Sequence, residues 1–281
     1  MASHKTGSKK SAGKKSAASG SPVRICFDRI IPHDYAPART TSLKAAAQSF
    51  GRGPIGHLDA TAGVIPAPHI AVVLGKKWPT GATLKCRFID QANASTFMKK
   101  KVEQKAHIWE KYANVKFKFV TSGDADIRIS FFADPGSWSA IGTDALVQAY
   151  FPKYQPTMNF GWLRDGTDDA EYERVVVHEF GHALGCIHEH QQPNAHLDWN
   201  TDAVYKYFSG PPNYWSKDDI DSNVLETYGP QGIGMTIFDP KSIMLYQFDG
   251  ALFKNGKGTP ENTHLSPLDE QFIAQMYPKK K

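Results

Sequence analysis

Alternating and helical hydrophobic patterns predict the order of elements in the middle of the chain. Segments 83–89, 115–120 and 126–132 alternate apolar and polar residues, which is typical of strands, and residues 157–163 predict a further short strand. Apolar residues recur every three or four positions at Met98, Val102, Ala106, Trp109 and Ala113. That spacing predicts an amphipathic helix. The order strand, helix, three strands and helix predicts a mixed α/β sheet crossed by one long helix.

A second helix is predicted from its end signals. It begins at Thr167 or Asp168, which is followed by acidic residues in the first turn, and it ends at Gly185. Residues 193–240 are rich in loop formers, with short helices predicted near Thr201 and Ser216. A last helix opens at Ser266, has proline in its first turn, and is predicted to bury Leu268, Phe272, Ile273 and Met276.

Composition indicates a globular chain with an unusual N-terminal tail. Of the 281 residues 41% are hydrophobic, which excludes a fully disordered chain, and no apolar run approaches the roughly 18 residues of a membrane span. The net charge of +5 resides in residues 1–22, which contain five lysines and no acid. This tail is predicted to be disordered, and binding to nucleic acid or acidic surfaces stays open.

Targeting signals and cysteines limit the class of protein further. The tail lacks the apolar segment of a signal peptide, so we expect a cytoplasmic protein or export by a non-classical route. The three cysteines, Cys26, Cys86 and Cys186, have no CxxC spacing, which argues against a disulfide framework. Cys86 lies between Leu84 and Phe88 in an alternating strand and is predicted to pack in the core.

The segment VVVHEFGHALGCIHEH, residues 175–190, carries the candidate chemistry. His178 and His182 are four residues apart, so both imidazoles leave one face of a helix and can reach one ion at about 2.0–2.1 Å. Gly185 then ends the helix, and the reversed chain can bring His188 to the same ion. Three neutral histidines leave one open position, as in catalytic rather than structural zinc sites. Glu179 is rotated by about 100° from His178 and is predicted to be the general base.

These residues match the extended pattern HExxHxxGxxH, and here the sequence resembles the metzincin zinc endopeptidases, within them the bacterial-type astacin-like group. Glu189 directly follows the third histidine, as in astacins. Residues 242–246, SIMLY, resemble the Met-turn, in which Met244 forms an apolar floor beneath the metal. Tyr246 matches the astacin tyrosine that ligates zinc and swings to stabilise the oxyanion. The resemblance covers residues 71–278.

The resemblance implies an α+β zincin-like fold. Such a fold has a twisted, mostly parallel sheet with an antiparallel edge strand, a backing helix and an active-site helix, followed by an irregular lower subdomain with a C-terminal helix. Composition and the resemblance together divide the chain into a disordered tail (1–22), an N-terminal extension (23–70) and a catalytic domain (71–281). Its implied activity is a zinc-dependent endopeptidase with one Zn²⁺ per chain, which hydrolyses peptide or protein substrates through a metal-activated water. A catalytically silent zinc-containing binding or interaction module is the alternative.

The chain departs from animal astacins in several places. Residues 190–200 lack their Arg/Asp pattern, and their two disulfides cannot be built from three cysteines. In those enzymes the glutamate after the third histidine pairs with the N-terminus freed by propeptide removal, and the partner of Glu189 here stays open. His190 and His196 are not expected to be ligands, because three histidines already complete the site.

A cleft of this kind binds peptide in extended form along an edge strand. Residues 157–163, which begin with Thr157 and end with Leu163, are the candidate, because Gly161 interrupts them as at an edge or bulge. An inner strand is the alternative. Residues 23–70 either pack on the catalytic domain or act as a pro-segment in which Cys26 or Asp59 takes the open position on zinc.

Overall fold

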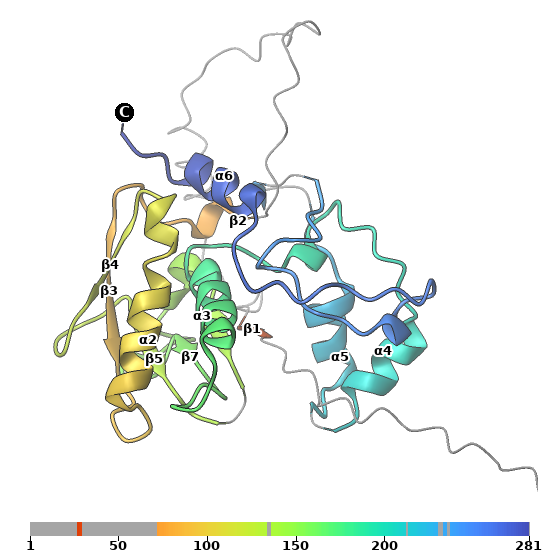
Figure 1. Cartoon of the computed structure of the whole chain (residues 1–281), viewed down its shortest axis with the longest axis horizontal. Coiled ribbons are helices and arrows are strands. Elements are labelled where there is room, and N and C mark those ends of the chain that lie inside the picture. The colour runs from red at the N-terminus through yellow and green to blue at the C-terminus, as the bar shows by residue number, and fades with distance from the viewer. Residues whose placement is uncertain are drawn as a thin grey trace, which may run out of the picture.

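The computed structural model of the chain describes residues 72–133, 136–211, 213–229 and 237–280, together with the backbone of residues 27–29 and 233–234. The predictions for the tail, for most of the 23–70 extension, and for Cys26 and Asp59 fall outside these residues. Figure 1 shows two lobes, one built around the sheet and the other around two short helices. Among the described residues, no helix has the length and apolar character needed to cross a membrane.

The first lobe is built on a mostly parallel sheet. Strands β4, β3, β5 and β7 lie side by side and run parallel, and β6 pairs antiparallel with β7. The bounds are β3 Thr83–Phe88, β4 Lys116–Phe119, β5 Ile127–Ser130, β6 Trp138–Ala140 and β7 Met158–Asn159. These five strands confirm the predicted zincin-like sheet with its antiparallel edge strand.

The antiparallel strand is β6, which the sequence patterns did not single out. The prediction of an edge strand at residues 157–163 is wrong, because β7 lies between β5 and β6. Gly161 instead marks a close approach of two main chains, since a Cβ there would lie 2.5 Å from the backbone of Gly136. On the outer side of β6, strand β1 (Phe27–Arg29) pairs parallel with it, with Phe27 opposite Trp138.

Helix α2 (Thr96–Ala106) covers the sheet beside α3 (Asp169–Ala183), as Figure 1 shows. The side chain of Ser95 accepts a hydrogen bond from Met98 N at 3.1 Å and caps α2. Helix α2 is shorter than the helix predicted from the apolar periodicity, which continues to Ala113. After Ala106 the chain tightens, and residues Trp109–Lys111 form the 3₁₀ turn η3. The Trp109 indole then donates to the carbonyl of Val177 at 2.8 Å and joins this turn to α3.

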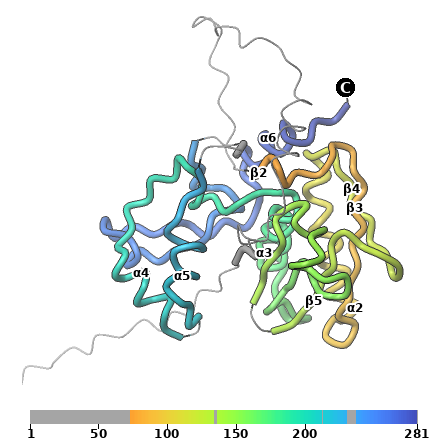
Figure 2. Tube along the Cα trace, turned by 180° about the vertical axis from the view of Figure 1, so that it is seen from behind, coloured from red at the N-terminus to blue at the C-terminus, as the bar shows by residue number. Residues whose placement is uncertain are grey.

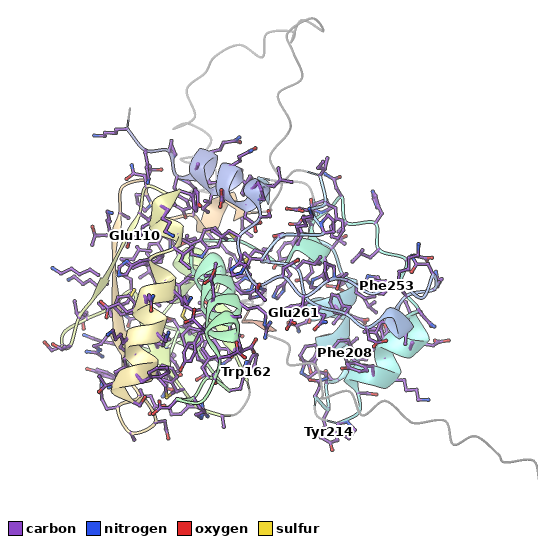
Figure 3. The ribbon with its side chains drawn as sticks, in the orientation of Figure 1. Glu110, Trp162, Phe208, Tyr214, Phe253 and Glu261 are labelled. Atoms are coloured by element: carbon purple, nitrogen blue, oxygen red, sulfur yellow. The ribbon has the colours of Figure 1, made fainter. Side chains whose placement is uncertain are left out.

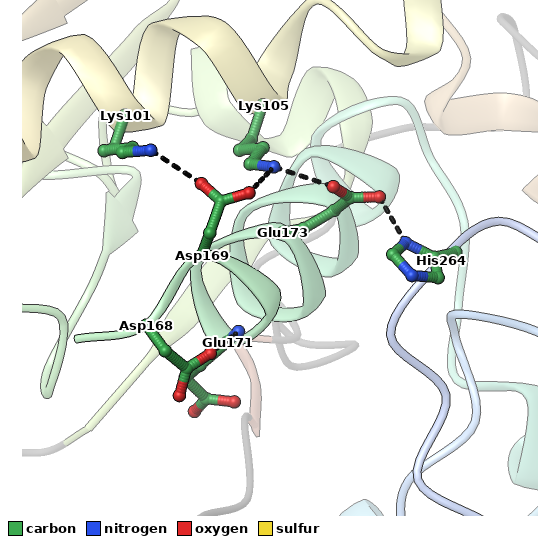
Figure 4. A network of polar contacts seen from close by, with 7 residues as sticks. All are labelled: Lys101, Lys105, Asp168, Asp169, Glu171, Glu173 and His264. Atoms are coloured by element: carbon green, nitrogen blue, oxygen red, sulfur yellow. Dashed lines mark hydrogen bonds and ion pairs between the residues drawn. The ribbon is translucent and has the colours of Figure 1, made fainter.

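An ionic network also fastens α2 to α3 (Figure 4). Lys105 Nζ lies 2.7 Å from carboxylate oxygens of both Asp169 and Glu173, and its side chain is only 7% exposed. Lys101 pairs with Asp169, and His264 Nδ1 lies 2.5 Å from Glu173. Glu173 therefore binds both Lys105 on α2 and His264, in the segment that leads into the last helix.

The C-terminal end of α3 is closed by residues from near both ends of the range 72–280. The Trp78 indole donates to the carbonyl of Ala183 at 2.7 Å, and the Tyr277 hydroxyl donates to that of Leu184 at 2.7 Å. Trp78 N in turn donates to the Tyr277 hydroxyl at 3.2 Å. These bonds satisfy carbonyls that a helix end leaves without intrahelical partners. Gly185 follows with φ of 101°, the left-handed conformation predicted for it.

The second lobe has little regular structure, as predicted. It contains α4 (Thr201–Phe208), α5 (Lys217–Ile220) and the π turn η6 (Asp221–Leu225), and Figures 2 and 3 show these apart from the sheet. Aromatic pairs form its interior: Phe208 stacks on Trp215 at 5.1 Å and Trp199 on Phe253 at 4.6 Å between ring centroids. The remaining short elements are β2 (Val72–Val73), η2 (Leu74–Lys76), η4 (Gly142–Leu146), η5 (Glu189–Gln191), β8 (Ile233–Gly234) and η7 (Gly250–Leu252).

The last helix, α6 (Pro267–Met276), returns to the first lobe, next to β2 in Figures 1 and 2. Ser266 and Asp269 form a capping box at its start. Phe272 and Ile273 are buried as predicted, whereas Leu268 and Met276 are only half-buried. Cys86 packs in the core as predicted, and Cys86 and Cys186 are both free thiols.

Candidate metal centre

Three histidine side chains converge at the end of α3. His178 and His182 leave one face of the helix, and the turn at Gly185 brings His188 back against them. Nε2 of His182 lies 3.0 Å from Nε2 of His178 and 3.1 Å from Nε2 of His188. The donor atoms of all three lie within 4.8 Å of one another. The sequence spacing therefore predicted a real convergence.

The hydrogen bonds of the Nδ1 atoms determine whether the Nε2 atoms carry a proton or a free lone pair. Nδ1–H of His178 donates to the carbonyl of Ile243 at 2.8 Å, and Nδ1–H of His182 donates to that of Cys186 at 2.9 Å. Nδ1 of His188 lies 3.3 Å from the side-chain oxygen of Gln191. These acceptors hold the proton on Nδ1, so each Nε2 presents a lone pair. Lone pairs about 3 Å apart do not bond to each other, and tetrahedral zinc with nitrogens at about 2.0–2.1 Å separates them by about 3.3 Å. The donor set fits one metal ion.

Electrostatics keep the first ligand candidate neutral. Burial lowers the pKa of His178 well below its ordinary value, and the neighbouring His182 and His188 lower it further. All three imidazoles are buried, with His178 only 4% exposed. Neutral imidazole is the form that binds a metal ion.

Met244 lies directly beneath the helix that carries the first two histidines. It is fully buried, and a Cβ added to Gly181 would lie 2.5 Å from its sulfur. Its carbonyl accepts a hydrogen bond from Glu189 N at 2.9 Å, so this turn also fixes the chain next to His188. Glycine at position 181 is required for this close approach between α3 and the turn at residues 242–246.

Asp269 of α6 supports the same turn from below. Its carboxylate accepts from the Ser242 hydroxyl at 2.7 Å, from Ile243 N at 2.8 Å and from Ser266 N at 2.9 Å. Burial raises the pKa of this carboxyl to about 7. One carboxylate therefore caps α6 and orients the Ile243 peptide whose carbonyl holds His178. The sequence signal was the S-x-x-D capping box, which predicts the helix start but not this second contact.

Tyr246 lies against the histidines. Its ring centroid is 4.0 Å from that of His188 and 5.6 Å from that of His178, and the side chain is 5% exposed. Glu179 is fully buried in α3, one position after His178. The structure thus brings the three predicted metal ligands and the tyrosine together, and the predicted general base is buried one residue after the first ligand.

Glu189 has well-defined contacts. Its Oε1 accepts from Asp239 N at 2.7 Å and from the side-chain amide of Gln192. Burial is the main cause that raises the pKa of this carboxyl well above its ordinary value. Within the described residues, the Glu189 carboxylate is therefore held by Gln192 and by Asp239, in the segment that precedes residues 242–246.

The two remaining histidines of this region differ from each other. His190 is buried, its Nε2 lies 3.1 Å from the carbonyl of Asn223, and its ring stacks near that of His188. His196 is exposed. Neither belongs to the group of three metal-binding candidates found in the described part of the chain.

Comparisons with known proteins agree with this geometry. The matrixin family of peptidases matches residues 77–226, more than half of the chain. Stromelysin-1 of Equus caballus is 27% identical over 142 residues, covering 46% of this chain and 28% of that protein. The zinc metalloproteinase nas-38 of Caenorhabditis elegans is 23% identical over 203 residues, covering 72% and 24%. The chain thus spans about a quarter of the length of these curated relatives.

Solved structures give a closer likeness. The structure of myroilysin is 44% identical and has a TM-score of 0.71, covering 75% of this chain and all of that chain. A second myroilysin crystal structure is 43% identical with a TM-score of 0.57, covering 73% and 86%. Fold, convergent histidines and family match lead to one assignment: the chain belongs to the matrixin family of metzincin metallopeptidases.

Proposed function

We propose that this protein is a zinc endopeptidase. The observation that carries the proposal is the convergence of three Nε2 atoms whose opposite nitrogens are each held by an acceptor. His178, His182 and His188 would hold one Zn²⁺ per chain. When bound, zinc supplies Lewis acidity, which polarises a carbonyl and makes water more acidic.

The protein's own groups move the protons. Glu179 lies one residue after the first ligand. One of its carboxylate oxygens accepts a proton from the attacking water and passes it to the leaving amine. The Tyr246 hydroxyl donates a hydrogen bond to the carbonyl oxygen of the substrate as negative charge develops there. Met244 closes the site from below and keeps water away from that side. The substrate is a peptide or protein segment.

The decisive experiment replaces Glu179 by glutamine, which keeps size and removes the base. Cleavage of casein or a peptide library should fall by about 10²–10⁴-fold, while metal analysis still finds one zinc per chain. Glu103→Gln is the matched control, because Glu103 is exposed on α2. It should leave both the cleavage rate and the zinc content unchanged. A zinc-loaded wild-type chain that cleaves no member of a broad library would favour the silent binding module.

Although the chain matches the matrixin family, we propose that its site is arranged like those of the astacin-like metzincins. Glu189 follows the third histidine, and Tyr246 stands two residues after Met244 with its ring over His188. Tyr246→Phe tests this placement, because it removes the hydroxyl and keeps the ring. It should lower kcat by about 10–10³-fold with little change in KM.

We also propose that residues 23–70 act as a pro-segment. Strand β1 occupies the outer edge of β6, the edge on which an extended substrate would otherwise add a strand. A chain that begins at residue 71 should therefore cleave a given peptide faster than the full chain. Equal rates for both chains would leave the extension with a packing role only.

A further inference from the structure

The outer face of the sheet, opposite α2 and α3, carries a group of basic side chains. Because side chains alternate along a strand, Cys86 packs into the core under the helices while Lys85 and Arg87 point the other way. The register places Lys85 beside Lys118 and Arg87 beside Arg128. Like charges directly opposite each other destabilise a sheet. The fold therefore keeps these pairs at a cost in stability.

A cleft with a volume of about 270 Å³ opens on this face. Its floor is formed by Lys85, Arg87 and Arg128. The turn before β5 forms one wall, with Asp124 and Asp126, and residues 145–153 form the other. Counting Lys153, four basic side chains face two carboxylates, a net charge of +2.

The positive charge on the floor of the cleft is only partly balanced by carboxylates. Arg128 is 6% exposed, and its N–H groups donate to main-chain carbonyls, at 2.7 Å to Gln155 and 3.0 Å to Phe151. Burial, and then the nearby charge of Arg87, lower the pKa of Arg128, and the Asp126 carboxylate offsets part of this shift. Among the described residues, none of the three basic groups on the floor forms a salt bridge with a carboxylate, whereas Asp124 is paired with Lys153 at 3.0 Å.

Arg87 is the group that can receive a ligand. It is half-buried, and one of its Nη atoms donates to the carbonyl of Gly123. Guanidinium has five N–H donors in a fork that fits a carboxylate with two parallel bonds. Arg128 adds charge from beneath, and Leu146, which is 51% exposed, offers an apolar contact on the wall.

We propose that this cleft binds an acidic peptide segment, in which a carboxylate meets Arg87 and an adjacent apolar side chain meets Leu146. Uniformly charged polymers fit less well, because Asp124 and Asp126 repel them. The cleft also has no aromatic ring in its lining on which a nucleic-acid base could stack. The volume lies just below the range of about 300–1,000 Å³ that is typical of small-molecule pockets, so one or two side chains fit.

The test is a binding measurement that does not depend on cleavage. The full chain carrying Glu179→Gln is titrated into a labelled, end-capped peptide of alternating leucine and glutamate, and fluorescence anisotropy is recorded. The glutamate peptide should bind at least about tenfold more tightly than its glutamine twin, and added salt should weaken it. Arg87→Gln should weaken binding by at least about fivefold, with Arg87→Lys in between.

Lys118→Gln is the matched control, because it removes one charge from the same face outside the cleft. It should change the affinity by less than about twofold. If Arg87→Gln fails to fold, as seen by circular dichroism, Lys85→Gln replaces it, since Lys85 is exposed. Equal binding of the two peptides, or equal losses in the cleft and control variants, would overturn the proposal. The proposal would also be overturned if heparin or single-stranded DNA bound more tightly than the glutamate peptide and if Arg87→Gln and Lys118→Gln weakened that binding equally.

Discussion

Ile243 and Asp269 are joined by a hydrogen bond of 2.8 Å from the Ile243 N–H to a carboxylate oxygen, and the carbonyl of Ile243 holds His178. A side chain of α6 thereby orients the first of the three candidate metal ligands through one peptide group. The contact is indirect, so Asp269 is a positioning residue and does not touch the reacting atoms.

Asp269→Asn should therefore weaken both stability and metal binding. The N–H groups of Ile243 and Ser266 both donate to Oδ2, and the amide oxygen can take that place. The new NH2 group then faces the Ser242 hydroxyl, which loses its acceptor at a cost of about 1–3 kcal/mol. Urea unfolding and zinc competition with a chelator measure the two effects. Asp202→Asn, at an exposed position of α4, should change neither.

The pH dependence of stability provides a test of the same carboxyl. Its pKa is raised from 3.8 to about 7 in the folded chain. The folded state therefore binds a proton more tightly than the unfolded state, and this contribution to stability is fully present below about pH 4 and is lost as the pH rises to about 7. Asp269→Asn should flatten the unfolding free energy over this window. An unchanged slope in the variant would contradict the assignment.

Gly181→Ala should force α3 and the turn that carries Met244 apart. The added methyl group would meet the Met244 sulfur at 2.5 Å and the Trp109 ring at 3.1 Å. Overpacking of this kind costs about 1–3 kcal/mol. Gly166→Ala is the matched control, because nothing lies within 4 Å of its added Cβ. Thermal melts of both variants, with and without zinc, separate a loss of packing from a loss of metal.

The Lys105 network predicts a loss of stability at low pH. The hydrogen bonds from Lys101 and Lys105 lower the pKa of Asp169 from 3.8 to about 2, so its contribution is present above about pH 4 and is lost as the pH falls to about 2. Lys105→Met should destabilise the protein by at most about 1 kcal/mol at neutral pH, a value kept low because Asp169 is largely exposed to water. The difference from wild type should shrink below pH 4, whereas Lys100→Met, exposed on α2, should be neutral throughout.

Removal of zinc should lower the melting temperature, because an ion that binds only the folded state stabilises it by mass action. His188→Ala should melt like the chelated wild type and respond little to added zinc. His196→Ala should keep the full response, since His196 is exposed and outside the group of three. A zinc-dependent shift that survives in His188→Ala would remove this histidine from the ligand set.

Local patterns predicted the parts of the site that are encoded locally. The spacing of His178, His182 and Gly185 fixes helix faces and a chain reversal within a few residues, so the convergence with His188 could be expected. Strand β6 could not, because its three residues carry no periodicity and its position depends on pairing with β7, far along the chain. The second contact of Asp269 was hidden for the same reason: a capping signal reports on its own helix and not on a turn 26 residues earlier.

The end of α3 has a consequence for how the protein is made. Its last carbonyls are taken by Trp78 and by Tyr277, residues 199 positions apart that also bond to each other. Contacts of such long sequence separation form late and slow folding. During synthesis on the ribosome, the helix end that leads to His188 therefore cannot be closed until residue 277 has left the exit tunnel. A nascent chain thus remains without a finished end of α3 until Tyr277 has emerged and can reach Leu184.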